Sequence, residues 1–119
     1  MDKSSFFAAA KANVKKKEVE LPGIGKVFVR VLKSKDRDQY EADVFGGEKF
    51  NYDHYRAKLV QMCACDETGN LIFAASDVQA IGDLPANVVN AIFHAAEEVN
   101  GFNKKALEQA EKNSEKSPA

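Results

Sequence analysis

Two alternating apolar runs on either side of a turn segment constrain the fold of this 119-residue chain more than any other feature. In residues 18–21 and 26–32, apolar and polar side chains alternate with period two, which is typical of half-buried strands. Between them lies Pro-Gly-Ile-Gly (22–25), where proline presets φ and glycine permits positive φ. The sequence therefore predicts an antiparallel hairpin near the N-terminus.

Helical spacing dominates the rest of the chain. The clearest helix is predicted over 86–100, with an apolar face that includes Val89, Ile92 and Phe93 and a polar face that includes His94, Glu97 and Glu98. On that polar face we expect His94 to pair with Glu98, four residues on. Further helices are predicted over 6–12, 35–45, 52–65, 77–81 and 104–112.

The expected helix starts follow from residues that can accept free backbone N–H groups. Ser4 or Ser5 is expected to cap the first helix, Ser34 the second and Asn51 the third, and Ser76 with Gln79 fits a capping box. A short apolar run at 71–73 is a candidate strand that adds to the hairpin. The predicted fold is a helix-rich α+β single domain with a small antiparallel sheet near the N-terminus and four to five helices.

The distribution of charge divides the chain into three parts. The formal net charge is −1, but residues 1–17 carry +4, residues 18–100 carry −6 and residues 101–119 carry +1. We expect an N-terminal helix and basic arm over 1–17, a folded α+β domain over 18–102, and a charged helix with a disordered tail over 103–119. This balance does not favour nucleic acid as a partner, and no apolar run approaches the roughly 20 residues of a membrane span.

No residue constellation in the sequence favours catalysis. Cys63 and Cys65 are too close for a structural disulfide, and Cys63 lies on the apolar stripe of its helix, as a buried free cysteine does. A reactive thiol and a zinc site completed by His54 and His94 are the alternatives, but zinc sites favour Cys-x₂₋₄-Cys spacing. His54, next to Asp53, is expected to face water. We expect no catalytic residue, no cofactor and no metal.

The N-terminal arm contains the candidate partner-binding residues. Phe6 and Phe7 stand on so short a helix that they either dock on the body or remain free for a partner. The lysine run Lys15, Lys16 and Lys17 is read as a solvated linker, with contact to an acidic protein as the alternative.

Three phrases of the chain resemble a known family. They are LPGIGKVFVRVL leading into KDRDQYEA (21–42), YRAKLVQMCACDETGNLIF (55–73) and SDVQAIGDLPANVVNAIFHAAEEVNG (76–101). In the order of their elements and in local sequence, they are similar to tail assembly chaperones of lambda-like, long-tailed bacteriophages (siphoviruses). The resemblance covers about residues 18–102.

The resemblance implies a protein that is not an enzyme. Members of this family bind the tape measure protein, keep it soluble and help to recruit the major tail protein, the tube subunit; self-association is possible. It implies action in the host cell cytoplasm and absence from the mature virion. The alternatives are a structural tail or head–tail joining protein, whose folds are richer in strands, and an interaction domain unrelated to phage.

The family also implies a longer product made by −1 ribosomal frameshifting, through which the major tail protein would be contacted. Glu111, Lys112 and Asn113 can be encoded GAA AAA AAC, which contains the slippery heptamer A AAA AAC in the required frame. The amino acids permit this site, and other codons would spell the same residues.

Overall fold

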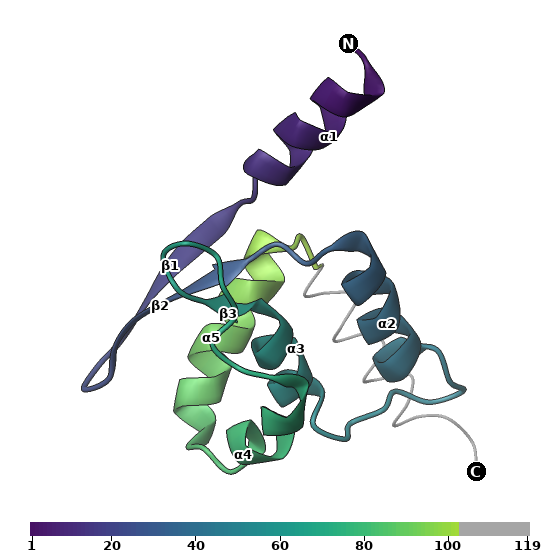
Figure 1. The fold of residues 1–119 in the computed structure, drawn as a ribbon. Coiled ribbons are helices and arrows are strands. Elements are labelled where there is room, and N and C mark those ends of the chain that lie inside the picture. Colours follow the sequence, from purple (N-terminus) through teal and green to yellow (C-terminus); the bar gives the residue numbers. More distant parts are fainter. Residues whose placement is uncertain (103–119) are drawn as a thin grey trace.

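The computed structural model describes residues 1–102, which form five α-helices and a three-stranded antiparallel sheet (Figure 1). The predicted helix-rich α+β fold is confirmed. The predicted helix over 104–112 and the residues Glu111, Lys112 and Asn113 lie outside the described part. In chain order the elements are α1 (Lys3–Ala12), β1 (Lys16–Leu21), β2 (Gly25–Arg30), α2 (Ser34–Phe45), α3 (Tyr55–Cys63), β3 (Ala64–Cys65), the 3₁₀ turn η1 (Ala75–Asp77), α4 (Val78–Gly82) and α5 (Ala86–Val99).

The predicted hairpin is present, with β1 antiparallel to β2. Val19 lies opposite Val27, and Leu21 lies opposite Gly25. The turn requires glycine at Gly25, where φ is +128°, outside the range that other residues readily adopt. On the face of the sheet that α5 covers, Val29 is fully buried. Period-two alternation therefore identified both strands and the face that enters the core.

The third strand was predicted at 71–73, and that prediction is wrong. The chain leaves α3 directly into β3, where Ala64 pairs with Val29 and Cys65 pairs with Phe28 of β2. Leu71 forms an isolated bridge to Cys65, and the Ile72 amide donates to the Ala64 carbonyl (3.0 Å), so this run lies beside β3 without forming a strand. Two buried residues after a helix carry no alternation of their own, so spacing alone assigned Ala64 and Cys65 to the helix.

The turn after β3 is organised by one carboxylate. Asp66 Oδ1 accepts hydrogen bonds from the Thr68 hydroxyl (2.7 Å), the Thr68 amide (2.9 Å) and the Asn70 amide (3.0 Å). These bonds, the Thr68 hydroxyl above all, hold the pKa of the Asp66 carboxyl below its ordinary value. The carboxylate of Asp66 therefore finds its hydrogen-bond partners within its own turn.

Acid is expected to weaken this turn through Asp66. A carboxyl whose folded pKa is depressed contributes stability above the unfolded pKa of about 4, and that stability is lost as the pH falls through the folded pKa. Asp66→Asn should therefore flatten the dependence of the urea midpoint on pH below about pH 4. An unchanged pH profile in the variant would show that these hydrogen bonds do not stabilise the folded state.

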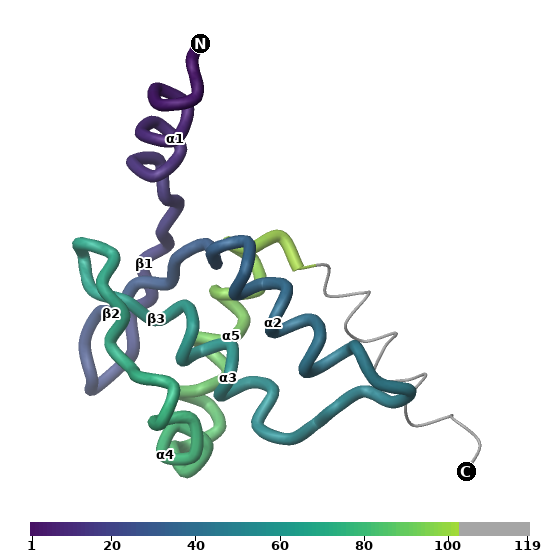
Figure 2. The backbone as a smooth tube through the Cα atoms, turned by 45° about the vertical axis from the view of Figure 1, so that its right-hand side comes forward, coloured from purple at the N-terminus to yellow at the C-terminus, as the bar shows by residue number. Residues whose placement is uncertain are grey.

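The core lies between the sheet, α5 and α3, and α2 packs on the other side of α3 (Figures 1 and 2). Leu59 of α3 and Ile81 of α4 are almost completely buried. An edge-to-face series of rings joins the loop before α3 to α5: the centroids of Phe50 and Tyr55 are 5.0 Å apart, and those of Tyr55 and Phe93 are 5.7 Å apart. These contacts hold α3 between α2 and α5.

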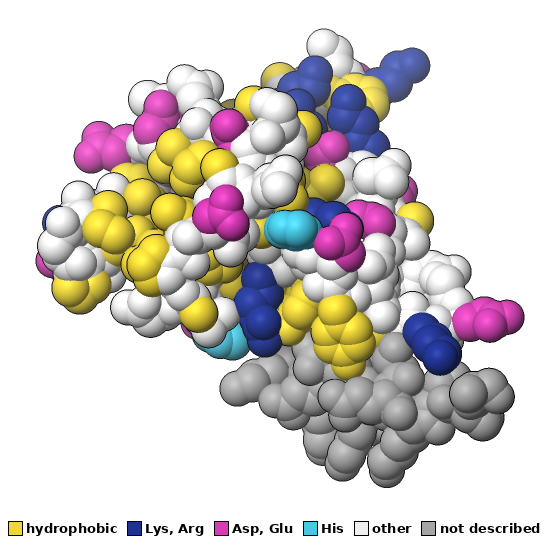
Figure 3. Space-filling model, turned by 90° about the horizontal axis from the view of Figure 1, so that it is seen from below, with side chains coloured by type: hydrophobic (Ala, Val, Ile, Leu, Met, Phe, Trp, Pro, Cys, Tyr) yellow, Lys and Arg dark blue, Asp and Glu magenta, His cyan; other side chains and the backbone are white. Residues whose placement is uncertain are grey.

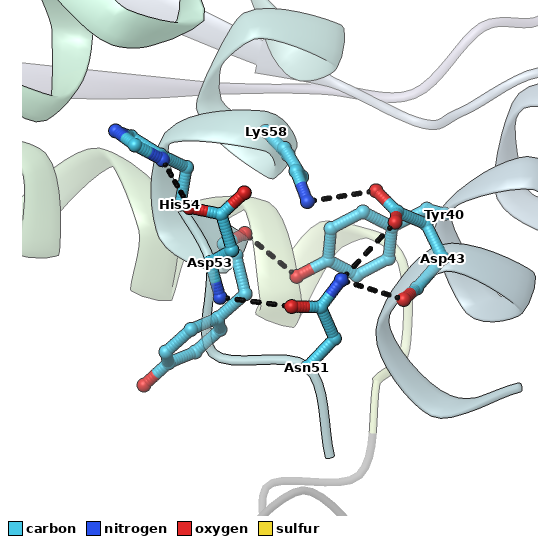
Figure 4. Close-up of polar contacts among 7 residues, drawn as sticks. Tyr40, Asp43, Asn51, Asp53, His54 and Lys58 are labelled. Carbon is cyan, nitrogen blue, oxygen red and sulfur yellow. Dashed lines mark hydrogen bonds and ion pairs between the residues drawn. The ribbon is translucent and has the colours of Figure 1, made fainter. Parts of the chain in front are cut away.

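The start of α3 differs from the prediction of a helix from residue 52 capped by Asn51. Asn51 Oδ1 accepts from the Asp53 amide (3.0 Å), which makes a local turn instead, and His54 then takes a left-handed φ of +53°. Figure 4 shows this turn anchored to the neighbouring elements: Asn51 Nδ2 donates to the Asp43 carbonyl (3.1 Å), and the Tyr40 hydroxyl donates to the Tyr55 carbonyl (2.9 Å). Side-chain bonding within the turn delays the helix to Tyr55.

The other helix starts also use different groups from those expected. Asp2, not Ser4 or Ser5, caps α1, since its carboxylate accepts from the Ser5 amide (2.7 Å). Ser34 is the first residue of α2 and makes no cap, because the N-cap position is Lys33. Before α4, the Asp77 carboxylate accepts from the Ala74 amide (2.8 Å), in place of the expected box of Ser76 and Gln79.

The end of α5 confirms the predicted stop but corrects the expected polar face. Gly101 takes a φ of +67° and ends the helix, and the Phe102 amide donates back to the Glu97 carbonyl (2.9 Å). Glu97 was expected in water, yet its side chain is buried, with 8% exposed, and pairs with His94 Nδ1 at 2.9 Å. His94 therefore pairs three residues on, and Glu98 pairs with Lys17 of β1.

Asn100 is a buried polar residue that joins three elements. Its Oδ1 accepts from the Leu32 amide at 2.7 Å, just before α2, and its Nδ2 donates to the Ala96 carbonyl at 2.9 Å in α5. The same Nδ2 reaches the Arg30 carbonyl (3.3 Å) at the end of β2. One amide thus fixes the sheet, α5 and the entry to α2 relative to one another.

Candidate protein-binding surface

Helix α1 stands clear of the body in both backbone views (Figures 1 and 2). It buries none of its residues. Phe6 and Phe7 are 57% and 54% exposed, and their rings contact each other edge to face, with centroids 6.1 Å apart. Of the two possibilities that the sequence left open, docking on the body is therefore not what the structure adopts.

Two half-exposed phenylalanines on a projecting helix are an available apolar surface. Full burial of a phenylalanine contributes about 1.5–3 kcal/mol relative to exposure. Since Phe6 and Phe7 are already about half covered, roughly half of that stabilisation remains available to a protein that covers α1.

The structure separates the three lysines of the arm. Lys15 is exposed in the link between α1 and β1, while Lys16 and Lys17 begin β1 and so lie on opposite faces of the strand. Lys16 Nζ donates to the Glu67 carbonyl, and Lys17 forms an ion pair with Glu98. Of the three residues predicted as a linker, Lys15 lies in the link and Lys16 and Lys17 belong to β1. These three lysines form no continuous basic patch.

A second apolar surface lies at the tip of the hairpin and was not predicted. It is an open cleft of about 380 Å³ between the hairpin tip, the loop after β3 and the start of α5. Figure 3 shows hydrophobic side chains gathered on this side of the molecule. We call it the hairpin cleft; its lining includes Leu21, Ile24, Val27, Ile72, Leu84 and Val88.

The hairpin cleft combines buried and exposed apolar side chains. Leu21 is buried at its base, whereas Ile24 is 62% exposed, Ile72 47% and Leu84 42%. Exposure of large apolar side chains to water is unfavourable. A contiguous patch of them, as at this turn and beside Pro85, is typical of an interaction site. The one signal in the sequence was Ile24, an isoleucine inside a turn where small or polar residues are usual.

The cysteines and histidines do not come together in one site. Cys63 and Cys65 are both buried and free, as the apolar stripe indicated for Cys63. Burial raises the pKa of the Cys63 thiol to about 12 and also raises the pKa of Cys65. His54 Nδ1 lies 2.8 Å from Asp53 and His94 pairs with Glu97. Within residues 1–102, no group of three or more His, Cys, Asp or Glu side chains could hold a metal ion.

Neither thiol is expected to react in the folded protein. A thiol reagent attacks the thiolate, and raised pKa values together with full burial leave almost none accessible at pH 8. Iodoacetamide should therefore modify Cys63 and Cys65 only after urea unfolding, as mass spectrometry of the alkylated chain would show. Rapid modification of either cysteine in buffer alone would revive a reactive-thiol role.

These surfaces do not by themselves identify a protein family, so the chain was compared with known proteins. No protein-family model matches the chain, and no curated protein matches it in sequence. Among solved structures, the tail assembly chaperone of bacteriophage HK97 superposes with a TM-score of 0.59 at 15% identity, over 85% of this chain and 99% of the other. The chain has the fold of a phage tail assembly chaperone.

That fold agrees with the resemblance seen in residues 18–102, which rested on turn phrases and the order of elements. At 15% identity the two sequences share little beyond this order, so the likeness concerns the backbone. None of the helices in residues 1–102 is both long and apolar enough to cross a membrane.

Proposed function

We propose that this protein is a phage tail assembly chaperone that binds the tape measure protein and keeps it soluble while the tail is built. The observation that supports this most is the match in fold to the HK97 tail assembly chaperone over almost the whole of that chain. It is not proposed as an enzyme, since the described thiols are buried and the histidines are paired with carboxylates.

The two apolar surfaces give this role a physical basis. A long helical rod exposes apolar side chains until tube subunits surround it, so a temporary cover needs apolar contacts that are individually weak and repeated. We propose that Phe6 and Phe7 of α1 and the hairpin cleft provide these contacts, with Lys15 available to an acidic neighbour. Weak contacts allow the major tail protein to replace the chaperone as the tube grows, and self-association of the body would repeat them along the rod.

The proposal includes a longer −1 frameshift product that contacts the major tail protein. The gene should read GAA AAA AAC at Glu111, Lys112 and Asn113, followed by an overlapping frame. GAG at codon 111 or AAG at codon 112 would remove this slip site. The remaining part of the proposal, action in the host cell cytoplasm, follows from a role before the tail is complete.

A phage that carries a stop codon early in this gene tests the function. The proposal predicts filled heads without tails, tape measure protein in the insoluble fraction, and rescue when the wild-type chain is supplied from a plasmid. Mass spectrometry of purified wild-type virions separates this role from a permanent structural one. Abundant copies of the chain in finished particles would favour a structural tail or head–tail joining protein instead.

A further inference from the structure

A second hollow lies where α1 meets the body, away from the hairpin cleft. It has a volume of about 750 Å³ and lies between the end of α1 and the segment that leads from β2 into α2. Apolar side chains form its floor: Val14 is 47% exposed, Val31 is half-buried and Leu32 is buried. We call this the junction hollow.

Three lysines stand around the junction hollow: Lys11 from α1, Lys15 from the link and Lys33 from the N-cap position of α2. None of the three forms an ion pair with another described residue, and all three are exposed. Of the other described lysines, Lys17, Lys26 and Lys58 pair with Glu98, Glu18 and Asp43. Lys3, Lys35 and Lys49 form no ion pair, but none of them lines the hollow.

The positive charge here contrasts with its surroundings. Residues 18–100 carry a net charge of −6, yet no carboxylate of the described chain reaches these three lysines. The N-terminus of α2 and the C-terminus of α1 both end at the hollow, so their opposite helix dipoles offset each other, and the positive charge there comes from the three lysines. The hollow is therefore an apolar surface whose charged edge residues are all lysines.

We propose that the junction hollow binds an amphipathic helix of a partner protein, which lays apolar side chains on Val14 and Val31 and places Asp or Glu carboxylates against Lys11, Lys15 and Lys33. An apolar helix face with charged flanks matches a groove of this kind, as in other helix-in-groove complexes. This goes beyond the proposed function, because it specifies the chemistry of a bound segment whichever protein supplies it.

Nucleic acid fits the hollow less well. Phosphate binding uses many basic contacts, and base stacking uses aromatic side chains. The junction hollow offers three lysines, and its lining includes no aromatic residue. Apolar floor and basic rim together favour a peptide that is both apolar and acidic.

Binding of two matched probe peptides to the full chain tests this proposal. Both are fluorescein-labelled amphipathic helices with one Leu/Ala face; one carries Glu on the flanks and the other carries Lys at the same positions. Fluorescence anisotropy should show binding of the Glu peptide, with the Lys peptide about tenfold weaker or more, as expected from three exposed ion pairs. The difference should shrink as salt is raised.

Charge-reversed variants locate the site. Lys11→Glu with Lys15→Glu and Lys33→Glu should abolish the preference for the Glu peptide. Lys3→Glu with Lys35→Glu and Lys49→Glu, an equal charge change at exposed, unpaired lysines that do not line the hollow, should leave it in place. Circular dichroism verifies that both variants fold. The comparison of the two peptides uses the wild-type chain, so it tests the proposal even if a variant fails to fold.

Three results would overturn the proposal: no binding of the Glu peptide, equal binding of the two peptides, or equal loss in both triple variants. Self-association of the chain that disappears only in the variant of the three hollow lysines would assign the hollow to a second copy instead. Since no tape measure protein enters these measurements, their failure would leave the chaperone proposal standing.

Discussion

Asn100→Ala is expected to lower the free energy of unfolding by about 2–3 kcal/mol. The substitution removes the acceptor of the buried Leu32 amide and the donor to the carbonyls of Ala96 and Arg30. A buried N–H left without a partner costs about 1–3 kcal/mol, and the removed amide also leaves unfilled space. Urea titration followed by circular dichroism measures the change.

Asn87→Ala is the matched control, since Asn87 lies on the same helix with an exposed side chain. It should change the free energy of unfolding by no more than about 0.5 kcal/mol. Asn100→Asp keeps an acceptor for the Leu32 amide but loses the donor, and it should also destabilise the fold. If Asn100→Ala behaved like Asn87→Ala, the amide would not be the connection between sheet, α5 and α2 that the geometry indicates.

Phe6→Ser with Phe7→Ser is expected to weaken binding to the tape measure protein by about 100-fold while leaving the stability of the body unchanged. About half of each ring is exposed in the free chain, so covering it is worth about 1–1.5 kcal/mol per ring. The two rings together contribute about 2–3 kcal/mol, which is roughly 100-fold in affinity. The unfolding midpoint should not move, because α1 buries none of its residues. A pull-down with immobilised tape measure protein, at graded chaperone concentrations, measures the loss.

Phe6→Leu with Phe7→Leu serves as the control for apolar area. Leucine retains most of the apolar surface and favours a helix at least as well as phenylalanine, so this variant should bind close to the wild-type level. Full binding by the serine variant would place the contact elsewhere, with the hairpin cleft as the next surface to test through Ile24→Ser.

The sequence predicts those elements whose causes lie among neighbouring residues, and it misses those that depend on contacts between distant residues. The hairpin and α5 depend on alternation, glycine at a turn and a helical apolar stripe, all within a dozen residues, and both appear as expected. The strand Ala64–Cys65 depends on β2 being close by, and two residues carry no period. The late start of α3 depends on Asn51 bonding within its own turn and to Asp43 eight residues away.

The candidate surfaces divide in the same way. Exposed aromatics and lysines were visible in the N-terminal arm, but whether Phe6 and Phe7 dock on the body is a matter of tertiary packing. The hairpin cleft brings together Leu21, Ile72 and Leu84, which lie far apart in the chain and share no local pattern. Glu97 was placed on the polar face by spacing, and only packing at the end of α5 shows it buried.

Co-expression with the tape measure protein tests the central claim most directly. The two genes are expressed together and apart, and the soluble fraction of the tape measure protein is measured, followed by affinity purification through a tag on the chaperone. The account predicts that the tape measure protein is largely insoluble alone, becomes soluble with this chain, and co-purifies with it. A tape measure protein that stays insoluble and fails to co-purify, although this chain is folded and abundant, would contradict the account.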